Sequence, residues 1–168
     1  MYFKCIFNAL RLGRNSFIIL AMKLSAYSDY AVRVLIQTAL RSPQRVTVAE
    51  VAQTFGISRH HLVKVVHDLG RSGYLTTQRG IGGGFTLARA PEAIRLGDIV
   101  RLGEETEKVI DCRDGAGQPC RLYPACRLKG VLDEAAAAFF AVLDRYTLDE
   151  LIQQPTKLRA VLGIETGR

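Results

Sequence analysis

The fold is decided by residues 47–87, which read TVAEVAQTFGISRHHLVKVVHDLGRSGYLTTQRGIGGGFTL. At the start of this stretch, Thr47 and Glu50 have the spacing of a capping box, in which each side chain accepts a hydrogen bond from the backbone of the other residue. Glycine suits the left-handed turn that ends a helix, so Gly56 is expected to close the short helix that Thr47 opens. The opening of the stretch therefore predicts a short helix and a tight turn.

A second helix and a hairpin are predicted to follow. Ser58 is expected to cap a helix over residues 58–70. Residues 74–77 and 85–87 resemble strands, and the glycine-rich segment 78–84 between them predicts the tip of a hairpin. The buried stripe of the helix is expected to be Leu62, Val65, Val66 and Leu69.

Helix, tight turn, helix and hairpin, in this order, are the arrangement of a winged helix-turn-helix. We expect the helix-turn-helix over about residues 47–71 and the wing over 74–87, with a helix over 27–40 before them. Another, long helix is predicted over 128–145. Its apolar stripe is expected to be Val131, Leu132, Ala135, Phe139, Val142, Leu143 and Tyr146. The predicted fold class is thus mainly α, with a small β-hairpin and a long C-terminal dimerisation helix.

The predicted organisation has five parts. The apolar run in residues 1–21 is too short to span a bilayer and no small-residue cleavage site follows it, which argues against a targeting segment. Because Met22 begins a better domain start, residues 1–21, which include Cys5, are interpreted as a non-core N-terminal extension. The other parts are a winged-helix domain (22–102), a cluster-binding loop (103–127), a dimerisation region (128–154) and a tail (155–168). Near the end of the dimerisation region, Thr147 is expected to begin a short helix that Pro155 ends.

The positive charge of the chain lies in its first half. The whole chain carries a net charge of +7, and residues 22–90 contribute nine basic and three acidic side chains. Residues 91–168 carry eleven basic and thirteen acidic side chains. A basic segment attracts a polyanion because bound phosphates release their counterions, although charge alone fits a solvated surface equally well. Together with the winged-helix order, the charge predicts binding to double-stranded DNA.

The second helix and the wing supply the groups that would touch DNA. Donors near the helix N-terminus are expected to meet base edges and phosphates in the major groove. The wing is expected to approach the backbone or a narrow minor groove, where arginine is favoured. The predicted DNA-binding residues are Ser58, Arg59, His60, His61, Lys64, Gln78, Arg79, Gly82 and Gly83. The alternatives are a helical fragment with a hairpin that serves another purpose, and metal ligation by the two histidines.

Three cysteines, Cys112, Cys120 and Cys126, form a C-x7-C-x5-C pattern in a loop that contains glycine and proline. An odd number of closely spaced thiols without a secretion signal argues against a disulfide framework and suggests a metal. The wide gaps favour an iron–sulfur cluster over structural zinc, which usually takes paired C-x2-4-C elements. The arginine that follows each cysteine would offset the negative charge of a cluster. Zinc and unmetallated cysteines remain the alternatives.

Several segments carry a family resemblance: Lys23–Arg33, Arg79–Phe85, Pro124–Gly130 and Ala141–Leu148. On these segments, the chain resembles the nitric-oxide-sensitive branch of the iron–sulfur winged-helix repressors over about residues 22–151. The resemblance implies a cytoplasmic homodimer with one cluster per subunit at the three cysteines, of the [2Fe–2S] or the [4Fe–4S] type. It also implies repression of nitric-oxide defence genes at a pseudo-palindromic operator.

Two positions in the first helix gain a role from the resemblance. Asp29 matches a position that, in some members, supplies a fourth, oxygen ligand from the other subunit. Arg33 matches a neighbour that couples the cluster to the DNA-binding domain, and it lies one helical turn from Asp29 on the same face. The gap between Cys112 and Cys120 is longer than is usual in the family. Lys129 stands where the cluster-biogenesis branch has histidine, which favours the nitric-oxide branch.

The expected function is therefore that of a DNA-binding transcriptional repressor whose operator affinity nitric oxide controls through an iron–sulfur cluster. No nucleophile–base pair or phosphate loop is evident, so an enzyme is not expected, nor is a membrane partner. The alternatives are a related cluster-, redox- or iron-sensing repressor and a structural-zinc module that binds a protein through residues 128–145. The colour of the anaerobically purified protein distinguishes the cluster hypothesis from the zinc hypothesis, because a cluster colours the protein brown and zinc does not.

Overall fold

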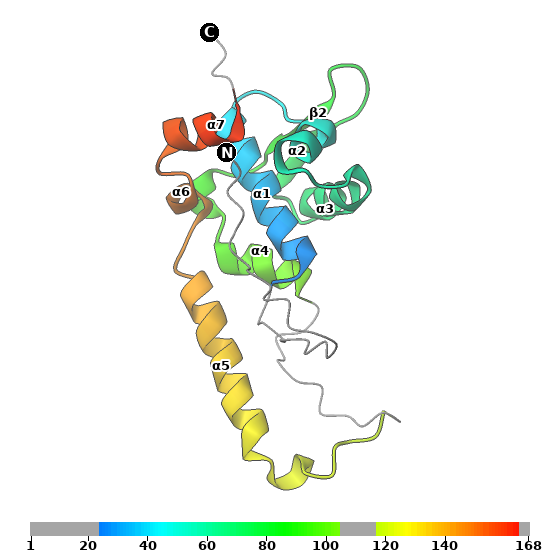
Figure 1. The fold of residues 1–168 in the computed structure, drawn as a ribbon, viewed down its shortest axis with the longest axis vertical. Helices are drawn as coiled ribbons and strands as arrows, with labels where there is room; N and C mark the ends of the chain where they lie inside the picture. Colours follow the sequence, from blue (N-terminus) through cyan, green and yellow to red (C-terminus); the bar gives the residue numbers. More distant parts are fainter. Residues whose placement is uncertain (1–23, 105–116, 165–168) are drawn as a thin grey trace, which may run out of the picture.

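The computed structural model describes residues 24–104 and 117–164 (Figure 1). The expected extension at residues 1–21 and Cys112 of the predicted cluster loop lie outside the described residues. Among the residues described, no helix is both long enough and apolar enough to cross a membrane.

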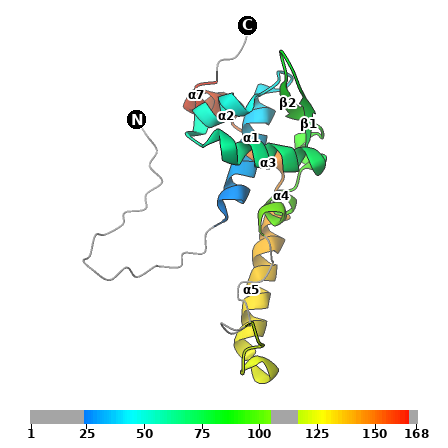
Figure 2. The same ribbon diagram turned by 90° about the vertical axis from the view of Figure 1, so that its right-hand side faces the viewer.

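The described chain is mainly helical with one antiparallel hairpin, which is the predicted fold class. The elements are α1 (Ala26–Arg41), α2 (Val48–Phe55), α3 (Arg59–Arg71), β1 (Leu75–Gln78), β2 (Gly84–Leu87), η1 (Pro91–Ala93), α4 (Leu96–Gly103), η2 (Tyr123–Ala125), α5 (Arg127–Leu143), α6 (Leu148–Leu151) and α7 (Pro155–Leu162). Figures 1 and 2 show α1 to α4 and the hairpin gathered into one body, from which α5 projects.

Local sequence signals set the helix ends of the helix-turn-helix. The predicted capping box is present: the Thr47 hydroxyl accepts the Glu50 N–H at 3.2 Å, and the Glu50 carboxylate accepts the Thr47 N–H at 2.7 Å. Gly56 ends α2 with φ of 65°, as expected for a left-handed cap. Ser58 stands at the N-cap position of α3, but its side chain makes no capping hydrogen bond, so that prediction is wrong in its chemistry.

The hairpin is held against the body by a short third segment. Leu75 pairs with Leu87 at one end and Gln78 with Gly84 at the other. Val46, just before α2, exchanges two backbone hydrogen bonds with Phe85, at 2.9 and 2.8 Å. At Gly84 a Cβ atom would lie 2.7 Å from the Val46 carbonyl oxygen, so only glycine lets this segment approach.

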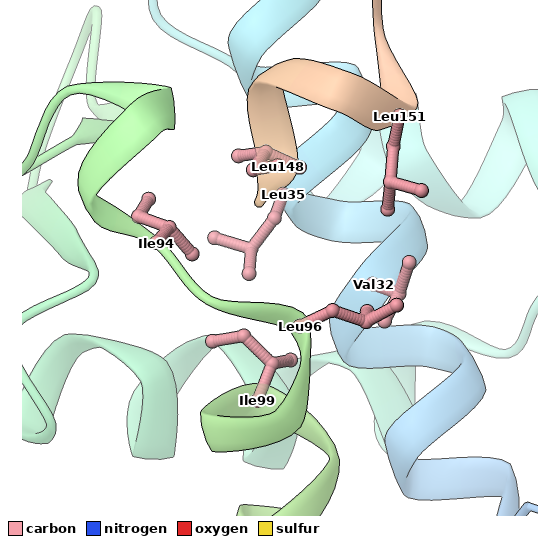
Figure 3. A pocket seen from close by; sticks show the side chains of 7 residues that line it. All are labelled: Val32, Leu35, Ile94, Leu96, Ile99, Leu148 and Leu151. Atoms are coloured by element: carbon pink, nitrogen blue, oxygen red, sulfur yellow. The ribbon is translucent and has the colours of Figure 1, made fainter. Parts of the chain in front are cut away.

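The core surrounds α1, which packs against α2, α3, α4 and β2. Full burial of a valine, leucine or isoleucine side chain in this core contributes about 1.5–3 kcal/mol to the free energy of unfolding, relative to leaving it exposed. Figure 3 shows an apolar junction where three segments meet. Leu35 of α1 and Leu148 of α6 point toward Ile94, which lies between η1 and α4. Its free volume is about 10 Å³, near the lower limit for one water, and the side chains that line it are all aliphatic. The core includes Ala31, Val34, Leu35, Val46, Val51, Leu62, Leu69, Phe85, Ile94, Ile99 and Leu148.

The C-terminal part differs from the prediction. Pro155 was expected to end a helix, but it is the first residue of α7, whereas α6 already ends at Leu151. The missing N–H and the fixed φ of proline suit the first position of a helix. Part of the expected tail is therefore helical, and Arg159 of α7 donates a hydrogen bond to the carbonyl of Leu40 at 2.9 Å.

A buried glycine and an ion pair join α5 to the body. The Arg101 guanidinium of α4 donates two hydrogen bonds to the Asp144 carboxylate, at 2.6 and 2.8 Å, and lies 4.6 Å from the centre of the Phe140 ring. The Asp144 carboxylate occupies the space where a Cβ atom of Gly97 would stand. The position of α5 therefore depends on the absence of a side chain at Gly97.

We expect the substitution Gly97→Ala to lower the free energy of unfolding by about 1–3 kcal/mol, because an added methyl group must displace the Asp144 carboxylate. Urea denaturation measures the change. Gly130→Ala in α5 is the matched control, since nothing lies within 4 Å of a Cβ atom there. It should leave stability unchanged or raise it by up to about 1 kcal/mol. Equal effects of the two substitutions would contradict the packing at Gly97.

Candidate DNA interface and cysteine site

The outward face of α3 carries the predicted major-groove residues. The predicted stripe of Leu62, Val65, Val66 and Leu69 is buried, which fixes the orientation of the helix. As a result, all five predicted positions at its N-terminal end are exposed: Ser58, Arg59, His60, His61 and Lys64. Figure 2 shows α3 lying across α1, with the hairpin beside it.

Two of these side chains contact tyrosines of α1. The His61 ring stacks on the Tyr30 ring, with centroids 6.3 Å apart. The Lys64 ammonium lies 5.1 Å from the centre of the Tyr27 ring and 3.0 Å from the carboxylate of Asp68. Sequence reasoning missed the two tyrosines and Asp68. The Lys64–Asp68 spacing of four residues was an available signal for an ion pair within the helix.

Asp68 is the charged centre of this contact. Its carboxylate also accepts the Tyr27 hydroxyl at 3.3 Å and lies 3.3 Å from a ring nitrogen of His67. The hydrogen bond from Lys64 is the main cause that holds the pKa of Asp68 below its ordinary value of 3.8. Burial, followed by the charge of Asp68, raises the pKa of Tyr27 to about 12. At neutral pH Asp68 is therefore ionised, while the Tyr27 phenol keeps its proton as a donor.

The wing tip is a closed turn made of glycines. The Gly83 N–H donates to the Gly80 carbonyl at 2.9 Å, and a Cβ atom on Gly83 would lie 2.6 Å from the Gln78 carbonyl. Positive φ angles at Gly80 and Gly82, 97° and 71°, complete the turn. Arg79, like Gly82, is exposed there, as predicted for a group that reaches DNA.

Gln78 is placed differently from Arg79 and the glycines of the wing tip. Leu75 points into the core, so Thr76 and Gln78 point to the opposite face of the hairpin. There Gln78 lines a polar groove of about 350 Å³ with Pro43, Gln44, Arg45, Thr76 and Thr86. It is therefore separated from the α3 residues by the hairpin itself.

Asp29 and Arg33 form an ion pair on α1. The Arg33 side chain meets the Asp29 carboxylate through two contacts, both of 2.9 Å, and both side chains are close to 40% exposed. The Arg33 guanidinium also lies 5.6 Å from the centre of the Phe55 ring of α2. The pair shares one helix face, as expected, and Arg33 links it to the helix-turn-helix.

Hydrogen bonds join the start of α1 to the end of α4. The Ser28 hydroxyl, which is fully buried, lies 2.7 Å from the Glu104 carboxylate, and the same carboxylate accepts the Ser25 N–H at 2.9 Å. A Cβ atom on Gly103 would collide with Ser28, so glycine is required for this approach. Residue 104 leads into the predicted cluster loop, whose beginning is thus tied to α1.

Two of the three predicted cluster cysteines lie in the described chain. Cys120 and Cys126 are free, partly exposed thiols on either side of η2, and the Tyr123 N–H closes the turn on the Cys120 carbonyl at 2.8 Å. Cys126 stands at the N-terminus of α5. Two thiols held beside one turn are soft donors that fit iron or zinc.

The predicted oxygen ligand lies elsewhere. Within residues 24–104 and 117–164, no three His, Cys, Asp or Glu side chains come together as a metal-binding group. Both views place η2 at the far end of α5, away from the start of α1, where Asp29 lies (Figures 1 and 2). Asp29 therefore does not meet Cys120 and Cys126 of its own chain.

The apolar residues of α5 divide between two faces. Ala136 and Phe140, which the predicted stripe omitted, are the buried residues of α5, and the Phe140 ring lies against Arg101 of α4. Of the predicted stripe, Leu132, Phe139 and Leu143 are half-buried. An exposed seam runs along the helix at spacings of three and four residues: Leu128, Val131, Ala135, Ala138 and Val142. Such a seam is typical of a helix that packs against another helix.

Comparison with known proteins agrees with this arrangement. The sequence profile of the Rrf2 family, described as iron-dependent transcriptional regulator, matches residues 24–154. The HTH-type transcriptional regulator NsrR of Bacillus subtilis is 42% identical over 145 residues, 86% of this chain and 99% of that protein. The structure of CymR, the global cysteine regulator of B. subtilis, has 26% identity and a TM-score of 0.61, over 79% of this chain and 98% of CymR. The structure of T. potens IscR is 24% identical in sequence and has a TM-score of 0.63, over 86% of this chain and 93% of IscR. This match shows a likeness of fold.

We expect the Asp68 carboxyl to titrate below pH 3.8, because the Lys64 hydrogen bond favours its ionised form. A depressed pKa means that the contact stabilises the fold above the unfolded pKa of Asp68, and that this stability is lost as pH falls through the folded pKa. Carbon-detected NMR of the carboxyl measures the midpoint. Lys64→Met should raise it, whereas Lys157→Met in α7 should not. A wild-type midpoint at or above 3.8 would contradict the ion pair.

Proposed function

Because the chain belongs to the Rrf2 family of iron-dependent transcriptional regulators, we propose that it represses transcription as a DNA-bound homodimer that nitric oxide releases through an iron–sulfur cluster. Family membership makes it a transcriptional regulator, and the prediction that it is not an enzyme is confirmed. The proposal is carried by one observation. The Asp29–Arg33 ion pair lies on α1, and so do the two tyrosines that contact α3.

In the proposed complex, α3 enters the major groove of DNA. The exposed Arg59 and His60 supply donors to base edges, and the helix N-terminus favours a phosphate. Arg79 at the rigid glycine turn reaches the minor groove on one side. Two copies of α3 in a symmetric dimer would read half-sites about one DNA turn apart, which requires a pseudo-palindromic operator.

The second copy is proposed to pack on the exposed seam of α5. Leu128, Val131 and Val142 are each 44–56% exposed, although they lie in line on one helix. The alanines between them, Ala135 and Ala138, leave room for the backbone of a partner helix to approach. Crossing of two such helices would bring the cysteine turn of one subunit toward the body of the other.

The cluster is proposed to be held by Cys112, Cys120 and Cys126, with Asp29 of the partner subunit as a fourth ligand. The separation of Asp29 from the cysteine turn within one chain supports a ligand that comes from the second copy. Thiolates are the ligands that iron–sulfur clusters require. A bound cluster, of either the [2Fe–2S] or the [4Fe–4S] type, would supply iron sites that nitric oxide can occupy.

Arg33 is proposed to transmit the state of Asp29. If Asp29 were to ligate the cluster of the partner subunit, its carboxylate would give up part of its ion pair with Arg33, while Arg33 would keep its contact with the Phe55 ring of α2. Loss of that ligand bond to nitric oxide would free the carboxylate to pair fully with Arg33 again. The carboxylate of an exposed pair moves at small cost, since such pairs contribute about 0–1 kcal/mol.

The proposed change at Asp29 would reach α3 through Tyr27 and Tyr30, which lie on the same helix. These rings contact Lys64 and His61 on the exposed end of α3. A change of a few kcal/mol suffices to release an operator, because specific and non-specific binding differ by about 4–10 kcal/mol. The proposed outcome in the cytoplasm is expression of genes for defence against nitric oxide.

We expect Val131→Asp to convert a dimer into a monomer, because each subunit would bury a carboxylate in the apolar contact of the seam. Sedimentation equilibrium of the anaerobically purified chain measures the mass. Ala137→Asp adds the same charge at another exposed position of α5 and should leave the dimer intact. A monomeric parent, or a Val131→Asp variant that remains dimeric, would contradict the seam as the subunit contact.

We expect Cys120→Ala to weaken binding to a duplex selected by the wild-type chain from a random pool by at least about tenfold, since operator binding depends on the cluster. The remaining binding should not respond to nitric oxide. An anaerobic gel shift measures both effects, and Cys5→Ala is the matched control. The switch is excluded if Cys120→Ala binds as tightly as the parent and nitric oxide releases both alike.

A further inference from the structure

The exposed face of α3 carries one aliphatic side chain among charged and imidazole groups. Val63 is 57% exposed, whereas Val65 and Val66 of the same helix are buried. Single exposed apolar residues are common on protein surfaces, so the position of Val63 is what matters. It lies on the helix that is proposed to enter the major groove, in the second turn from the N-terminus.

Val63 lies in a strip with Arg59 and His67, which are four residues away on either side and equally outward-facing. The other side of the exposed face is engaged by the protein itself. Lys64 is drawn to Asp68 and the ring of Tyr27, as described above. Within the strip, a ring nitrogen of His67 also lies 3.3 Å from the Asp68 carboxylate. Arg59 and Val63 are therefore the part of the face that a base edge can approach without displacing a contact to Asp68.

The side chain of a valine in a helix is well suited to recognise an apolar group on a binding partner. Because valine is branched at Cβ, one χ1 rotamer dominates in a helix. Its two methyl groups are then held in place before any partner arrives, and little side-chain entropy is lost on contact. Arg59 and His67, by contrast, offer donors that suit N7 and O6 acceptors.

We propose that Val63 packs against the C5-methyl group of a thymine in the major groove and so selects thymine at one position of each half-site. This inference rests on the proposed function and deepens it. Thymine is the one base that presents an apolar group in that groove. Removal of one methyl-sized apolar group from the contact corresponds to about a fourfold loss of affinity.

Replacement of thymine by uracil tests this contact, because uracil lacks only the methyl group. Full-length, anaerobically purified chain selects a duplex from a random pool, and each thymine is then replaced in turn. Fluorescence anisotropy gives the affinities. We expect one uracil position in each half-site to weaken wild-type binding about three- to fivefold, and Val63→Ala to bind thymine and uracil duplexes equally at that position.

Ile81→Ala is the matched control. Ile81 is also an exposed aliphatic residue, but it lies at the tip of the wing, away from α3. This variant should keep the full uracil effect, whatever its overall affinity. The inference is overturned if wild-type binding ignores uracil at every position, or if Val63→Ala keeps the same loss as the parent. A pool from which no duplex is enriched would overturn the proposed DNA binding itself.

Discussion

The contact between the beginning of α1 and the end of α4 is the constraint on which the rest of the arrangement depends. The Glu104 carboxylate satisfies both the buried Ser28 hydroxyl and the Ser25 N–H, the second of which would otherwise be an unpaired donor at a helix N-terminus. Gly103 permits the two helices to approach this closely. Since Glu104 belongs to the proposed cluster loop (103–127), the loop begins at the helix that also supports α3.

From this anchored end, α1 reaches two different sites within two turns. Tyr27 and Tyr30 support the exposed end of α3, and Asp29 and Arg33 form the pair to which a sensing role is proposed. Residues separated by three or four positions in a helix are neighbours on its surface. In the proposed switch, a change at Asp29 would therefore reach the surface proposed to contact DNA through one helix, without passing through a chain of loops.

The sequence predicted those features that arise from neighbours in the chain. The capping box at Thr47, the buried stripe of α3 and the glycine hairpin all depend on residues within a few positions of each other. Features that join distant segments were missed, because no periodicity reports them. Arg101 meets Asp144 across 43 positions, and Tyr27 meets Asp68 across 41. The Pro155 error has a local cause, since proline both follows helices and begins them.

The central claim is that the state of the cysteine site sets the separation of two α3 helices in a dimer. Its most direct test is the distance between dyes attached to a non-natural amino acid in place of the exposed Arg71 of each subunit. Energy transfer would be compared for cluster-loaded and chelator-treated protein. The account predicts one narrow distribution, with helices about 34 Å apart, in the loaded dimer, and a shifted or broadened one after chelation. Identical distributions in the two states would contradict it.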